Sequence, residues 1–106
     1  MSKYLIKGDE LKKYLEEEEV VLVDFSSPFC APCKKVPPIF EELEGDFGER
    51  VSFLEINVAE DNDLALNYDV FSVPTIIVFK KGEEKERISG VPNRKKLSSV
   101  LNKLIS

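Results

Sequence analysis

Histidine is absent from the 106-residue sequence, and cysteine occurs only twice. A structural zinc site takes four ligands, which are usually cysteine and histidine side chains. This chain does not supply such a set alone, so a zinc ion would have to be shared between chains. We therefore expect no metal site and no other bound cofactor.

Long hydrophobic runs are also missing. The longest apolar stretches have the length of a strand, far short of the roughly 20 residues that cross a membrane as a helix. The start, Met1-Ser2-Lys3-Tyr4, carries a charge but is followed by no apolar core of a signal peptide. We therefore expect a cytoplasmic protein without membrane contact, and in that compartment disulfides are rarely structural.

An excess of basic residues is absent as well, because 15 Lys and Arg stand against 20 Asp and Glu. Nucleic-acid-binding proteins usually carry a basic stripe on their surface. The basic runs here are short, lie among many acids and are typical of solvated surface: Lys12-Lys13, Lys34-Lys35, Lys80-Lys81 and Arg94-Lys95-Lys96. No nucleic-acid partner is expected.

The residues that are present suit a folded domain. Apolar residues make up 42% of the chain and charged residues 33%, which is enough to fill a core and coat a surface. The length is that of one domain, so we expect a single domain over residues 1–106, and a monomer.

Strand-like and helix-like stretches alternate, which predicts a layered α/β domain with a mixed central sheet and helices on both of its faces. The predicted strands cover about 4–6, 20–23, 51–58, 75–79 and 84–89. The predicted helices cover about 9–17, 30–47, 64–68 and 93–105. Asp9 and Asn93 are the expected N-caps of the first and last helices. Pro37 and Pro38 predict a kink in the second helix, since proline lacks an amide donor and crowds the preceding turn.

The two cysteines form the motif Cys30-Ala31-Pro32-Cys33, directly after a predicted buried strand and at the start of a predicted helix. Pro32 fixes one φ angle in the turn, and the helix N-terminus favours a thiolate at Cys30. A structural disulfide here would close a very small loop and stabilise little. This spacing beside a βαβ pattern favours redox chemistry over the structural and metal alternatives.

Asp24 follows four apolar residues in a strand that is predicted to be covered on both faces. A charged, unpaired carboxylate in such a place costs several kcal/mol. We therefore expect a raised pKa for Asp24, which suits a group that exchanges protons with Cys33. The alternative is that Asp24 lies past the covered part of the strand.

Six short segments carry a resemblance to a known family, in its order and spacing over nearly the whole chain. They are Val23-Asp24-Phe25-Ser26, Phe29-Cys30-Ala31-Pro32-Cys33-Lys34, Pro38, Val73-Pro74-Thr75, Phe79-Lys80-Lys81-Gly82 and Ser89-Gly90. In these segments the chain resembles the thioredoxin family. The resemblance implies the thioredoxin fold and a dithiol–disulfide oxidoreductase that acts as an electron carrier and reduces protein disulfides.

The resemblance also implies roles for the two cysteines. Cys30 would be the exposed nucleophile that attacks a substrate disulfide, and Cys33 would resolve the mixed disulfide. No cofactor is implied beyond the reversible Cys30–Cys33 disulfide. The implied partners are disulfide-containing proteins and a thioredoxin reductase as electron donor.

A substrate-docking surface is implied around the cysteines. Pro74 occupies the family's cis-proline position, where with Val73 it would offer backbone groups and apolar surface to an extended substrate segment. The other expected docking residues are small or apolar: Phe29, Ala31, Pro32, Gly90 and Val91. Lys34 and Thr75, in the resembling segments, and Glu55 are expected to support the site, although solvated surface is at least as good an interpretation of Lys34.

Departures from the family pattern lie near the same site. Phe29 stands where tryptophan is common, and Ala31 stands where glycine is common. Glu55 stands where many bacterial members have lysine near the buried aspartate, and like charge there would raise the Asp24 pKa further.

Three other functions remain open: a disulfide oxidant or isomerase on the same fold, a glutaredoxin-like protein, and a non-catalytic binding module.

Overall fold

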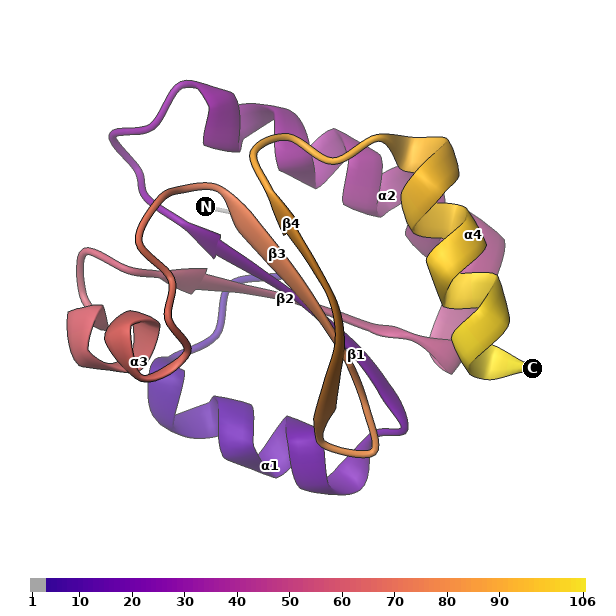
Figure 1. Cartoon of the computed structure of the whole chain (residues 1–106). Coiled ribbons are helices and arrows are strands. Elements are labelled where there is room, and N and C mark those ends of the chain that lie inside the picture. The colour runs from indigo at the N-terminus through magenta and orange to yellow at the C-terminus, as the bar shows by residue number, and fades with distance from the viewer. Residues whose placement is uncertain (1–3) are drawn as a thin grey trace.

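A four-stranded sheet forms the centre of the computed structural model, which describes residues 4–106. Its strands are β1 (Val20–Ser26), β2 (Ser52–Asn57), β3 (Thr75–Lys80) and β4 (Glu83–Ser89). They lie in the order β2-β1-β3-β4, with β1 parallel to β2 and the other neighbours antiparallel (Figure 1). The prediction of a mixed sheet is thereby confirmed.

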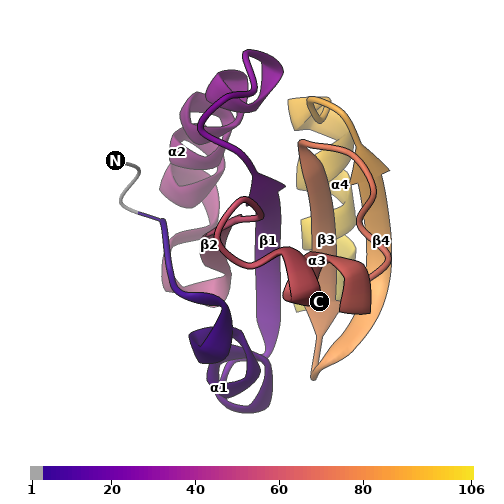
Figure 2. The same ribbon diagram turned by 90° about the vertical axis from the view of Figure 1, so that its left-hand side faces the viewer.

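Four helices cover this sheet: α1 (Leu11–Glu17), α2 (Val36–Phe47), α3 (Asn62–Asn67) and α4 (Arg94–Ile105). Figure 1 shows α1 and α3 on one side of the sheet and α2 and α4 on the other, and Figure 2 shows α3 in front of the strands and α4 behind them. Two apolar clusters fill the layers between helices and sheet, one on each face. The structure has the predicted helices on both faces.

Alternation along β1 assigns its side chains to these two clusters. Val20 and Leu22 belong to the α2–α4 cluster, whereas Val21, Val23 and Phe25 belong to the other. Every residue of β1 is buried, as the unbroken apolar run predicts. By the same alternation, Asp24 lies on the α2–α4 face.

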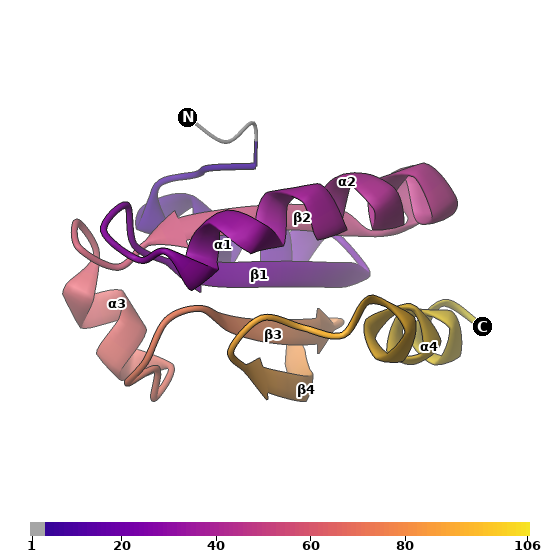
Figure 3. The same cartoon turned by 90° about the horizontal axis from the view of Figure 1, so that it is seen from above.

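The second helix begins later in the chain than predicted. A 3₁₀ turn covers Pro32–Lys35, and α2 begins only at Val36, so the predicted continuous helix with a kink is wrong. Pro37 and Pro38 lie in the first turn of α2. Amides in that turn have no intrahelical partner, so the prolines remove no hydrogen bond. After the 3₁₀ turn, α2 runs back along β1 (Figure 3).

Two other local predictions are corrected. Asp9 does not cap a helix: it lies inside a 3₁₀ turn, Gly8–Glu10, where the Lys7 amide donates to Glu10 Oε1 at 2.9 Å. The predicted strand at 4–6 is only an isolated parallel bridge between Leu5 and Glu55. The segment does lie beside β2, because the Ile6 amide donates to the Glu55 carbonyl oxygen at 2.9 Å.

The end of the chain follows the prediction more closely. Asn93 caps α4 with its side-chain oxygen, which accepts a hydrogen bond from the Lys96 amide at 3.0 Å. Lys81 and Gly82 form the turn between β3 and β4, and both have positive φ, 52° and 82°. Such a turn matches the right-handed twist of a two-strand hairpin.

Candidate active site

Cys30 and Cys33 are joined by a disulfide at the point where the chain passes from β1 towards α2. Their Cα atoms lie 5.3 Å apart. Cys30 is partly exposed, whereas the Cys33 side chain is only 3% exposed. The Cys33 amide donates to Cys30 Sγ at 3.2 Å. That hydrogen bond and the nearby start of a helix favour negative charge on Cys30 once the disulfide is reduced.

The loop between α3 and β3 approaches the disulfide. Its Val73–Pro74 peptide bond is cis, which is the isomer expected at this position. The Val73 carbonyl oxygen lies 3.7 Å from Cys30 Sγ. The structure therefore brings residues that are 43 positions apart in sequence to the same site.

Apolar surface surrounds the exposed cysteine. Phe29 is 89% exposed, and Ala31 and Pro32 of the cysteine loop are exposed as well. Gly90 donates its amide to the Pro74 carbonyl oxygen at 2.8 Å, so the turn with Gly90 and the exposed Val91 adjoins the cis-proline. The predicted docking residues thus come from three separate segments of the chain.

One exposed aromatic residue in this region is missing from the sequence-based set. Phe71 is 80% exposed and stands two residues before Val73, in the same loop. A signal for it exists in the sequence, since this aromatic residue lies outside the predicted helix at 64–68 and the predicted strand at 75–79. Exposed apolar groups that adjoin a reactive site are typical of a binding surface.

Asp24 is 1% exposed, and its Oδ1 has no hydrogen-bond partner among the described residues. The alternative that it lies past the covered part of the strand is therefore wrong. Burial, and secondarily the nearby charge of Glu55, raise the pKa of Asp24 from 3.8 to about 8. Glu55 stands opposite Asp24 in the parallel β1–β2 pairing, which explains its effect.

Replacement of Glu55 by glutamine tests the electrostatic part of this shift. In Glu55→Gln the Asp24 pKa should fall below about 8 but stay well above 3.8, because burial is the larger cause. The measurement is an NMR titration of the Asp24 carboxyl carbon in the oxidised protein. Glu49→Gln, which removes an exposed carboxylate from the turn after α2, is the control. An Asp24 pKa that is identical in wild type and Glu55→Gln would contradict the assignment.

Besides Glu55, two supporting residues were predicted, Thr75 and Lys34, and they differ in their surroundings. Thr75 is buried, and its hydroxyl donates to the Ser72 carbonyl oxygen at 2.8 Å, which ties the cis-proline loop to the start of β3. Lys34 is exposed, and its backbone amide donates to the Ala31 carbonyl oxygen at 3.2 Å. A role of Lys34 in the local field stays a prediction.

Residues 4–106 contain neither a cluster of potential metal ligands nor a helix that could span a membrane. In that part of the chain, no three or more histidine, cysteine, aspartate and glutamate side chains gather as metal ligands would. None of its helices is both long and apolar enough to cross a membrane.

Comparison with known proteins decides the family, since the family model described as thioredoxin matches residues 3–103. The chain belongs to the thioredoxin family. Its Cys30–Cys33 pair is the redox-active disulfide of a thiol–disulfide oxidoreductase. The sequence-based prediction of fold and activity is confirmed.

Individual relatives support the same conclusion. A thioredoxin of Staphylococcus epidermidis is 41% identical over 87 residues, which cover 82% of this chain and 84% of the relative. The chloroplastic thioredoxin M4 of Arabidopsis thaliana is 39% identical over 88% of this chain and 48% of its own length. Among solved structures, a mutant thioredoxin from Halobacterium salinarum matches with a TM-score of 0.88 at 29% identity, over 96% of this chain and 89% of the other.

Proposed function

We propose that this thioredoxin-family protein reduces disulfide bonds of other proteins and is itself re-reduced by a thioredoxin reductase. The unequal exposure of the two cysteines supports this proposal most directly. Cys30 is accessible beside the cis-proline loop, whereas Cys33 is 3% exposed. A protein disulfide can reach the first sulfur and not the second, which gives the exchange a fixed order.

The first step is attack by the Cys30 thiolate on one sulfur of the substrate disulfide. A bond forms between Cys30 and that sulfur, and the other substrate sulfur leaves as a thiolate that takes up a proton. In the second step the Cys33 thiolate attacks Cys30. The Cys30–Cys33 disulfide forms, and the second substrate thiol is released, so that two electrons pass to the substrate.

Cys33 has to lose its proton in the second step, and Asp24 is the proposed acceptor. Asp24 is a buried carboxyl on the α2–α4 face of the sheet, the side on which the chain passes from Cys33 into α2. With its pKa raised to about 8, Asp24 can both hold and give up a proton near neutral pH.

The proposed docking surface for the substrate surrounds Cys30. It comprises three segments: the exposed Phe29, Ala31 and Pro32 of the cysteine loop; the partly exposed Val73, followed by Pro74, which is itself buried; and Gly90 and Val91. Phe71 extends it along the cis-proline loop. Such a surface, with backbone groups at Val73, suits an extended and partly apolar segment of the substrate.

The cellular location, the oligomeric state and the partners of the protein are also proposals. Its relatives include bacterial thioredoxins and chloroplastic ones. For this chain we propose the cytoplasm, a monomer, and a single domain over residues 1–106. We propose protein disulfides and a reductase as its partners, not nucleic acids or membranes.

Loss of the nucleophile tests the function. With dithiothreitol as electron source and insulin as substrate, Cys30→Ser should reduce disulfides no faster than dithiothreitol alone, because no other thiol is exposed among the described residues. Equal turnover by wild type and Cys30→Ser would refute the proposal.

A reduction potential measured against glutathione distinguishes a protein that reduces disulfides from one that forms them. Thioredoxins in general have potentials of about −270 mV, and disulfide isomerases have potentials of about −180 mV.

A further inference from the structure

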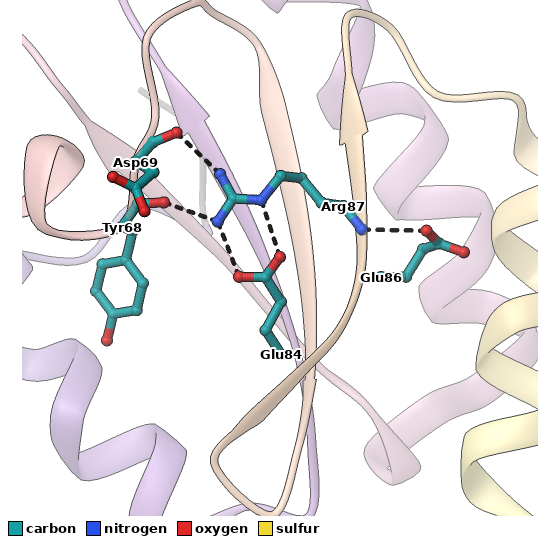
Figure 4. A network of polar contacts seen from close by, with 5 residues as sticks. All are labelled: Tyr68, Asp69, Glu84, Glu86 and Arg87. Carbon is teal, nitrogen blue, oxygen red and sulfur yellow. Dashed lines mark hydrogen bonds and ion pairs between the residues drawn. The ribbon is translucent and has the colours of Figure 1, made fainter.

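Arg87 of the edge strand β4 makes a network of hydrogen bonds with the end of α3 (Figure 4). Its Nη2 donates to the Tyr68 carbonyl oxygen at 2.7 Å, and Nη1 donates to the Asp69 carbonyl oxygen at 3.0 Å. Glu84 orients the guanidinium, since Nε and Nη2 donate to its two carboxylate oxygens at 2.9 and 2.8 Å. The guanidinium group is thereby held between the Glu84 carboxylate and the two backbone carbonyl groups.

The two carbonyl groups belong to the turn that ends α3. Asp69 is in the left-handed region, with φ 57°, and its amide donates to the Leu66 carbonyl oxygen at 3.0 Å. The Val70 amide donates to the Ala65 carbonyl oxygen at 2.9 Å. This pattern is a Schellman motif, in which the carbonyl groups of the cap itself need partners from elsewhere. Arg87 supplies those partners and places a cation at the negative end of the helix.

The chain that leaves this turn leads directly to the reactive site. Residues 70–74 carry the exposed Phe71 and the cis Val73–Pro74 bond, and Val73 O lies 3.7 Å from Cys30 Sγ. The residue that follows β4 holds the far end of the loop, because the Gly90 amide donates to the Pro74 carbonyl oxygen at 2.8 Å. The loop is therefore attached to the β4 region at its start by Arg87 and at its end by Gly90.

We infer that Arg87 is a positioning residue for disulfide exchange, which holds the loop 70–74 in the place where it receives the substrate. The inference rests on the proposed function, in which this loop contacts the substrate. Arg87 does not touch the reacting sulfurs and acts through the loop backbone. Lysine would not replace it, because one ammonium group does not present a planar fork to two carbonyl groups and a carboxylate at once.

The test compares two disulfides that differ in their need for the loop. Reduced wild type, Arg87→Met and Arg87→Lys react with insulin and with hydroxyethyl disulfide, a molecule too small to contact the whole loop. The rate constant with insulin should fall about five- to tenfold in both variants, and that with hydroxyethyl disulfide should stay within about twofold, because only orientation of a large substrate is lost. The reduction potential should be unchanged.

Lys85→Met is the matched control. Lys85 lies two positions away on β4 and, within residues 4–106, pairs with the exposed Glu83 at 3.1 Å. Its loss therefore removes one positive charge from the same strand without releasing the loop. The amides at the two ends of the loop, those of Asp69, Val70 and Gly90, are hydrogen-bonded to the Leu66, Ala65 and Pro74 carbonyl oxygens. Their hydrogen exchange should be faster in Arg87→Met and unchanged in Lys85→Met. This second measurement reports loop position without reference to activity.

The outcomes separate the two proposals. If wild type does not reduce insulin, the proposed function fails, and this inference fails with it. If wild type reduces insulin and Arg87→Met does so at the same rate, only the inference fails. An equal fall in rate with both disulfides, or an equal effect of Lys85→Met, would show a general structural contribution of Arg87 and would also overturn the inference.

Discussion

Cys33→Ser is expected to arrest the reaction at the mixed disulfide, with substrate bound covalently to Cys30. The reason lies in the second step: serine cannot attack the Cys30–substrate bond, and no other free cysteine is present among the described residues to replace it. After reduced Cys33→Ser is mixed with a disulfide-bonded protein and quenched with acid, mass spectrometry should show a one-to-one complex as the main product. Wild type should show almost none, because its buried thiol resolves the complex within the same molecule.

The complementary variant is the control for this assignment. Cys30→Ser retains only the thiol at Cys33, which is 3% exposed in the oxidised protein, and should form little complex. A complex that accumulates with Cys30→Ser and not with Cys33→Ser would reverse the roles of the two cysteines. Complex formation by both to the same extent would show that burial does not select the nucleophile.

Sequence patterns predicted those parts of the fold whose signal is local. The unbroken apolar run of β1 indicates burial on both faces, and the structure buries all seven of its residues. Asn93 precedes a helix with a regular apolar face, and it caps that helix. In both cases the residue type and its near neighbours fix the backbone, so little depends on the rest of the chain.

The incorrect predictions concern positions where more than one local structure fits the sequence. Asp9 is a good capping residue, but the first turn begins after Lys7, two residues earlier, where the Glu10 carboxylate accepts a hydrogen bond from the Lys7 amide. Pro37 and Pro38 fit either a kink or a helix start, and the structure uses the start. The segment 4–6 has strand character, yet only its bridge to β2 forms. Such choices depend on packing that a local pattern does not contain.

In the candidate site, too, the residues in local sequence motifs were predicted and those that depend on long-range contacts were not. The cysteines, Asp24 and Pro74 stand in recognisable motifs, whereas Arg87 stands in a run of charged residues that is typical of an exposed edge strand. Its partners, Tyr68 and Asp69, are 19 and 18 positions away, and the contacts are made through their backbone carbonyls. Every residue has a backbone carbonyl group, so the residue types at these positions do not indicate which carbonyl oxygens accept hydrogen bonds from Arg87.

The buried carboxyl of Asp24 makes stability depend on pH in an unusual direction. In the unfolded chain its pKa is about 3.9, whereas in the fold it is about 8. Between these values the folded state holds a proton that the unfolded state has lost. The free energy of unfolding is therefore highest below about pH 4 as far as this group is concerned, and it falls as pH rises towards 8. The slope for one proton is about 1.4 kcal/mol per pH unit.

The other groups with shifted pKa values do not change the free energy of unfolding over the same pH range. Hydrogen bonding to Arg87 lowers the pKa of Glu84, so its contribution is lost only as pH falls below the ordinary range of a carboxyl group. Burial raises the pKa of Tyr68 above its ordinary value of 10, which is beyond the window on the other side. Between about pH 5 and 7.5 the slope from Asp24 should therefore dominate in the oxidised protein, whose cysteines do not titrate.

Asp24→Asn is expected to remove this slope, since the amide does not ionise. Denaturant unfolding of the oxidised wild type should show a loss of about 3 kcal/mol between about pH 5 and 7.5, and that of Asp24→Asn should be nearly flat. The variant should also resolve the mixed disulfide about 100-fold more slowly, because Cys33 then lacks a proton acceptor. A flat wild-type profile would show that Asp24 is ionised in the fold. A flat variant profile with unchanged resolution would confine Asp24 to stability and assign the proton from Cys33 to another acceptor.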